Sequence, residues 1–205
     1  MSDININKEF SEFGKKAQIL GILALISFLL SIVAFFVAIV GYINSAVQVV
    51  SLIIMILATG NIKRAGLALK NQSLLAFRSK IIIALILVLI GGIIIGVGIA
   101  GIVAIAYGPN PEAWEGYVVF GLMILIGLIF IIVGAVLQIL AWKDLKNFFK
   151  TNKSMFPEEI GNKAESGSNL MMIGAILTLT FILAFIGFIL MVIGYFKLSA
   201  LKDLE

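Results

Sequence analysis

The chain has 205 residues, of which 61% are hydrophobic and 13% are charged, and its net charge is +4. A soluble domain carries about 45–50% apolar and about 25% charged residues, and at this length it cannot bury a larger apolar share. The chain contains no cysteine and no histidine, which excludes disulfides, thiol nucleophiles and histidine-ligated metal or haem sites. We therefore expect an all-α integral membrane protein with no cofactor, no metal and no catalytic residues.

The first apolar run covers residues 17–60 and follows a charged N-terminal segment, residues 1–16. As one helix this run would be about 66 Å long, roughly twice the thickness of a hydrocarbon core, so it must fold back on itself. Its polar cluster, Gly41 to Ser45, predicts a tight turn. The two resulting spans cover about 18–40 and 45–60.

Residues 61–80 mix basic and apolar side chains, and two interpretations remain open for them. They form either a basic helix that lies on the membrane surface or a helical extension followed by an ordinary loop. The uncharged stretch 81–107 is the third predicted span. A loop with Pro109 and Pro111 separates it from the fourth, at 117–142.

The longest polar connection covers residues 143–169, and its segment 161–168 has the composition of a flexible loop. Glu158 and Glu159, next to Pro157, are suited to the first turn of a short helix, where negative charge is stabilising. Residues 170–196 form the last span. The sequence thus predicts a polytopic helix bundle with five spans, in which residues 17–205 make up one transmembrane domain.

The positions of Lys and Arg predict the orientation of the chain. Both connections 61–80 and 143–169 are rich in these residues, whereas the loop between the third and fourth spans has none. Positive residues favour the cytoplasmic side, so we expect a multi-pass cell-membrane protein with its N-terminus in the cytoplasm. Five spans leave Lys197 and Lys202 outside. A hairpin within 170–196 would give six segments and bring both inside, but each half would reach only about 20 Å, and the stretch lacks a Pro or Asn to mark a hinge.

Two glutamines are the most notable polar residues within the predicted spans. Gln48 and Gln138 are expected to be buried in the membrane, where an unpaired amide is costly. They belong either to a polar pathway or to interhelical hydrogen bonds that hold the bundle together. The predicted spans contain no charged residue, which argues against a proton-coupled pump or a carrier that selects charge.

Small residues recur at intervals of four along the third span, at Gly92, Gly96, Ala100 and Ala104. Residues four apart share a helix face, so this pattern predicts a groove in which another helix backbone can approach closely. The groove serves either packing within the chain or association between copies.

The order of these features is familiar. Phe77-Arg78, Met155-Phe156 and the stretch from Leu170 to Thr178 carry the pattern, with Gly187-Phe188 downstream. On these residues the chain resembles an archaeal family of small multi-span membrane proteins known as a domain of unknown function. The resemblance implies a membrane location and an archaeal source, and it brings no activity and no site residues.

These observations favour a non-enzymatic membrane protein that works through helix packing, as a scaffold or as an accessory subunit of an assembly. Its expected partners are membrane lipid and either a second copy or other membrane subunits, and nucleic acid is not expected because the basic residues form no platform with interleaved aromatics. The alternative is a transporter or channel for small neutral or apolar solutes.

Overall fold

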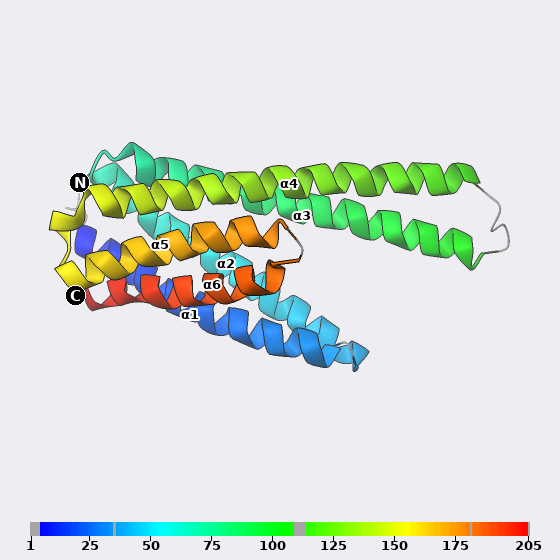
Figure 1. Ribbon diagram of the computed structural model, residues 1–205, viewed down its shortest axis with the longest axis horizontal. Coiled ribbons are helices and arrows are strands. Elements are labelled where there is room, and N and C mark those ends of the chain that lie inside the picture. Colours follow the sequence, from blue (N-terminus) through cyan, green and yellow to red (C-terminus); the bar gives the residue numbers. More distant parts are fainter. Residues whose placement is uncertain (1–4, 35, 109–113, 181, 205) are drawn as a thin grey trace. The chain divides into compact units, whose positions relative to one another are not determined.

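The computed structural model describes residues 5–34, 36–108, 114–180 and 182–204, and every element in these ranges is helical (Figure 1). The helices are α1 (Ile6–Ala34), α2 (Ala38–Ala68), α3 (Gln72–Ala106), α4 (Trp114–Thr151), η1 (Lys153–Met155), α5 (Glu158–Thr178), α6 (Ala184–Leu198) and η2 (Ser199–Leu204). The predicted all-α class is confirmed. Five segments are long and apolar enough to cross a membrane, namely α1, α2, α3, α4 and the stretch from α6 into η2.

The contacts within the chain define two compact units. Unit 1 comprises residues 1–81 and 139–205, and unit 2 comprises residues 82–138. Helices α3 and α4 contribute to both units, because each continues unbroken through a unit boundary. Every Lys and Arg of the chain belongs to unit 1.

The polar cluster at 41–45 does not form the predicted turn. Helix α1 ends at Ala34 and α2 already begins at Ala38, so Gly41 to Ser45 is helical. The prediction failed because these polar groups find partners without a turn: Ser45 Oγ donates to the carbonyl oxygen of Gly41, and the Asn44 side chain bonds to α1.

Residues 61–80 are a helical extension and a short turn, so the interpretation as a surface helix was wrong. Helix α2 runs to Ala68, and Asn71 opens α3 by accepting a hydrogen bond from the backbone nitrogen of Leu74 at 3.2 Å. Between them, Lys70 has a φ of 50°, in the left-handed region where a residue reverses the chain after a helix.

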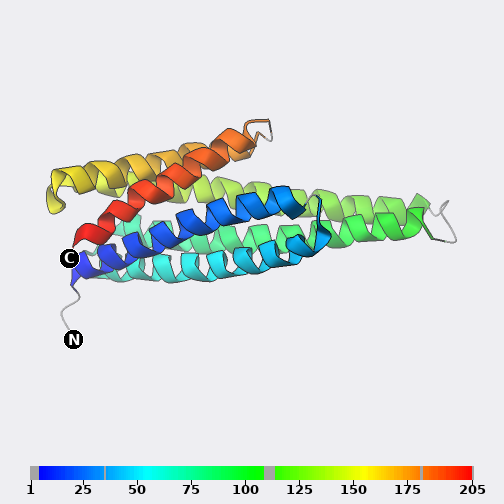
Figure 2. The same ribbon diagram turned by 90° about the horizontal axis from the view of Figure 1, so that it is seen from below.

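The segment 170–196 is a hairpin of two helices, so its prediction as one span was wrong and the alternative is the observed form (Figure 2). No Pro or Asn is needed at the break, because Thr180 supplies the polar group. Its Oγ1 donates to the carbonyl oxygen of Leu177 at 2.7 Å and accepts from the backbone nitrogen of Leu183 at 3.3 Å. The hydroxyl therefore closes the end of α5 and opens α6.

Glycines hold the two arms of this hairpin together. A β-carbon built on Gly174 would lie 2.7 Å from the carbonyl oxygen of Gly187, and one built on Gly187 would lie 2.7 Å from that of Gly174. Gly167 and Gly194 are paired in the same way, at 2.9 and 3.0 Å. Such close contact between backbones is possible only where both helices lack side chains.

The connection 143–169 is also more regular than predicted. Helix α4 continues to Thr151, and the segment 161–168, expected to be a flexible loop, lies within α5. The prediction that Glu158 and Glu159 begin a helix is confirmed, although α5 is 21 residues long and not short. Ala164 and Ser168 are fully buried, which explains why this polar segment is ordered as a helix.

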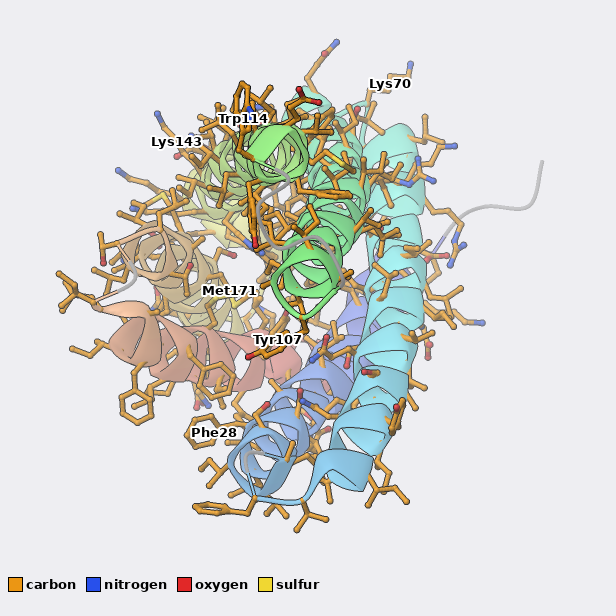
Figure 3. The ribbon with its side chains drawn as sticks, turned by 90° about the vertical axis from the view of Figure 1, so that its right-hand side faces the viewer. Phe28, Lys70, Tyr107, Trp114, Lys143 and Met171 are labelled. Atoms are coloured by element: carbon orange, nitrogen blue, oxygen red, sulfur yellow. The ribbon has the colours of Figure 1, made fainter. Side chains whose placement is uncertain are left out.

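The polar ends of the helices in unit 1 enclose a shared aromatic core. The ring centroid of Phe10 in α1 lies 5.6 Å from that of Phe148 in α4 and 5.2 Å from that of Phe156. The core side chains that are 2% exposed or less include Phe10, Phe13, Phe77, Trp142, Leu145, Phe148 and Phe149. Lys70 and Lys143 point away from the helices at this end (Figure 3). Unit 1 thus has one end built like a small water-soluble bundle, with aromatics inside and charges outside.

The apolar parts of the helices have the opposite character. Leu29 in α1 is 61% exposed and Ile39 in α2 is 67% exposed, and many large aliphatic side chains along these helices are exposed in the same way. In water such a surface would be costly, whereas in a bilayer it faces lipid tails. The chain is therefore a multi-pass membrane protein.

Candidate functional site

The predicted small-residue face of α3 is uncovered. Gly92, Gly96, Ala100 and Ala104 are all exposed. A β-carbon built on Gly92 or on Gly96 would meet no atom within 4 Å. Within unit 2, therefore, this face is not the one that packs against α4.

Other glycines hold α3 and α4 together in unit 2. A β-carbon on Gly91 of α3 would lie 2.7 Å from the carbonyl oxygen of Gly127 in α4, and one on Gly98 would lie 3.0 Å from that of Phe120. On α4, a β-carbon on Gly134 would lie 3.0 Å from the carbonyl oxygen of Ala84. The face of α3 that packs against α4 thus differs from the predicted stripe, although Gly91 and Gly92 are adjacent in the sequence.

A spacing of seven marks the glycines that pack. The pairs are Gly14 and Gly21, Gly91 and Gly98, Gly127 and Gly134, Gly167 and Gly174, and Gly187 and Gly194. Seven residues are close to two helical turns, so both members of a pair face the same neighbour. This is the signal by which the sequence could have identified the internal faces.

The two glutamines belong to different units of the structure. Gln48 is exposed on α2 in unit 1, and Gln138 is half-buried at the last residue of unit 2. Neither side chain is enclosed between helices of its own unit, and the structure supplies no observation that links either one to a solute pathway.

The interhelical polar contact near the start of α2 is made by a residue that sequence reasoning had assigned to a turn. Asn44 is 8% exposed and lies between α1 and α2. Its Oδ1 accepts from Ser27 Oγ at 2.6 Å, and its Nδ2 donates to Ser31 Oγ at 2.9 Å. This cluster joins the two helices.

Charged contacts join the polar ends of the helices in unit 1. Glu9 accepts from Arg64 Nε at 2.8 Å and from Asn61 Nδ2 at 2.7 Å, which connects α1 to α2. Lys80 Nζ lies 2.6 Å from Asp144 Oδ2 and connects α3 to α4. Among the described residues no group of three or more carboxylates gathers into a metal site, and these ion pairs act as links between helices.

Comparisons with known protein families, with curated proteins and with solved structures find no match to this chain. The resemblance to the archaeal family therefore stays a prediction, and the case for function rests on the geometry of the chain itself.

Proposed function

We propose that this protein is a non-enzymatic multi-pass membrane protein that acts by helix packing, as a scaffold or accessory subunit, through the small-residue face of α3. The observation that carries the proposal is the contrast between two sets of small residues on one helix. Gly91 and Gly98 are used within the chain, whereas Gly92 and Gly96, one and two positions away, meet nothing.

The chemistry of the face supports a helix as its occupant. Transmembrane helices associate where Gly and Ala let the backbones approach, because lipid tails are as apolar as the helices and the gain comes from close packing. A face with small residues four apart is complementary to itself across a two-fold axis, so the simplest occupant is α3 of a second copy.

The charge distribution supports a cytoplasmic location for the polar end of unit 1. Ser11 Oγ in α1 donates to the carbonyl oxygen of Lys202 at 2.9 Å, so the C-terminal tail returns to the end where α1 begins. The hairpin thereby brings the tail lysines to the same end as the other basic residues of unit 1. One orientation of the chain then puts all of these positive charges on the cytoplasmic side, which they favour. We place this end, and with it the N-terminus, in the cytoplasm.

The test is the oligomeric state of the purified full-length protein in mild detergent, measured by native mass spectrometry. We expect a dimer or a larger assembly of the unchanged chain. Gly96→Leu should convert it to monomer, because a large side chain keeps the two backbones apart. Gly121→Leu is the matched control, since Gly121 is an exposed glycine of α4 and a β-carbon built on it also meets no atom within 4 Å.

An unchanged chain that is strictly monomeric in detergent, and that cross-links to no partner in its native membrane, would refute the proposal. Equal effects of Gly96→Leu and Gly121→Leu would also count against it, because association would then not depend on the α3 face.

A further inference from the structure

A polar cavity of about 290 Å³, open to the surface, lies between α4 and α5 in unit 1. It is lined by Lys146 of α4 and by Asn162, Glu165, Ser166 and Asn169 of α5. The four α5 residues are spaced as i, i+3, i+4 and i+7, so they share one face of the helix. Each phosphate oxygen is similar in size to a water molecule, which occupies about 30 Å³ in the liquid, so a phosphate group fits in this space.

Neighbouring lysines pair with three acceptor oxygens of the wall. Lys153 Nζ donates to Asn162 Oδ1 at 3.2 Å and pairs with Glu165 at 2.7 Å. Lys197 Nζ donates to Ser166 Oγ at 2.8 Å. The donors that remain available to a ligand are the amide N–H groups of Asn162 and Asn169 and the Ser166 O–H, and the second Glu165 oxygen remains as an acceptor.

The charge of the cavity is positive. Glu165 is neutralised by Lys153, whereas Lys146 has no hydrogen bond or ion pair with any residue in the part of the chain that the structure describes. Lys163, which follows Asn162, is occupied on the outer surface, where it donates to Glu159 at 2.6 Å and lowers the pKa of that carboxyl group. Lys146 is thus the cation that a ligand would meet, and donors surround it.

The cavity lies next to the apolar parts of both helices. Lys146 is one turn beyond Trp142, where the apolar part of α4 ends, and Asn169 directly precedes Leu170, where the apolar part of α5 begins. Ile176 lies two turns after Asn169 on the same face of α5 and is 42% exposed, which leaves an apolar surface beside the cavity.

We propose that this cavity binds a phosphate group, held by the ammonium of Lys146 and by the amide and hydroxyl donors of α5. An ammonium and several N–H and O–H donors around one space are the arrangement that a phosphate requires. The position of the cavity suits the headgroup of an anionic lipid whose chains follow α5, and a soluble phosphate compound is the other source of the same group.

The test is a binding titration of the purified full-length protein in neutral detergent, in two arms. One arm uses short-chain phosphatidic acid and the other uses inorganic phosphate, and the melting temperature reports binding. Lys146→Gln should weaken binding about tenfold or more, because it removes a charge-assisted hydrogen bond. Lys143→Gln is the matched control, since it removes the same charge from an exposed position outside the cavity and should change the Kd by less than about twofold.

A second variant, Asn169→Asp, replaces a donor by a negative charge and should weaken binding at least as much, which keeps the test decisive if Lys146→Gln folds poorly. Phosphatidic acid binding that is lost in both cavity variants supports a lipid headgroup site. If inorganic phosphate binds as tightly as phosphatidic acid and is weakened equally by both cavity variants, the site is supported and its natural ligand is a soluble phosphate compound. Equal weakening by Lys143→Gln, or no saturable binding in either arm, would overturn the proposal.

Discussion

At the scale of the residue, the glycines of α3 differ in whether they leave room for a side chain. Gly91 faces a backbone carbonyl of α4, whereas Gly92, the next residue, faces open space. An added methyl group at the first position displaces the neighbouring helix, and at the second it meets nothing within the chain. The same residue type on the same turn of α3 is therefore tightly packed at one position and open at the next.

We predict that Gly91→Ala destabilises the protein by about 1–3 kcal/mol, the usual cost of overpacking a close contact. Gly92→Ala should leave stability unchanged or raise it slightly, because Ala favours a helix over Gly. Thermal unfolding of both variants in the same detergent checks this. Equal losses of stability in the two variants would mean that Gly91 does not pack closely against Gly127 of α4.

The sequence predicted that the small residues of α3 matter for packing, but it did not identify the ones that pack against α4. The spacing of four in Gly92 and Gly96 was the conspicuous pattern, whereas the spacing of seven in Gly91 and Gly98 was not weighed. A single helix cannot show which of its two small faces meets its own chain. That depends on the partner helix, where Gly127 and Gly134 carry the same spacing.

At the scale of the element, polar side chains decide where helices pair and where they break. Asn44 was assigned to a turn because Asn is common in turns, yet its amide is satisfied by two serines of α1. Thr180 was overlooked as a break because Thr is tolerated inside helices, yet its hydroxyl serves both ends of the break. The partners of Asn44 lie on another helix, 13 and 17 residues away in the sequence, so local composition cannot reveal them. The hydrogen bonds of Thr180 depend on the local backbone geometry, which composition does not encode either.

We predict that Asn44→Leu lowers stability by about 1 kcal/mol, the usual value of interhelical hydrogen bonds in membranes. The loss is small because the unfolded chain in a membrane also finds partners for its polar groups. Ser45→Ala is the control, since Ser45 bonds only to its own helix at Gly41. Steric trapping or denaturation in mixed micelles measures both variants, and an unchanged Asn44→Leu would show that the cluster does not join α1 to α2.

At the scale of the whole molecule, the hairpin α5–α6 reconciles the charge pattern with the helices. As a single span, 170–196 would have separated Lys197 and Lys202 from the other thirteen basic residues. The apolar part of α5, residues 170–178, is only about 14 Å long at 1.5 Å per residue, too short to cross a hydrocarbon core of about 30 Å, so the hairpin enters and leaves from one side. All the basic residues then share the polar end of unit 1.

This arrangement predicts the topology of the tail. The chain has no cysteine, so each introduced cysteine is the only thiol present. Asp203→Cys should react with a membrane-impermeant maleimide from the same side as Lys70→Cys, and Glu115→Cys, at the start of α4, should react from the opposite side. Labelling of Asp203→Cys together with Glu115→Cys would instead place a full span between α5 and the tail.

The central claim, that the uncovered face of α3 receives a helix of a second copy, is tested most directly by cysteine cross-linking along 92–104 in proteoliposomes of the purified protein. We predict disulfide-linked dimers for single cysteines at 92, 96, 100 and 104, and little linkage at 94 and 102, which are half-buried and lie on the other side of the helix. Absence of linkage at all positions, or equal linkage at every position, would contradict the account.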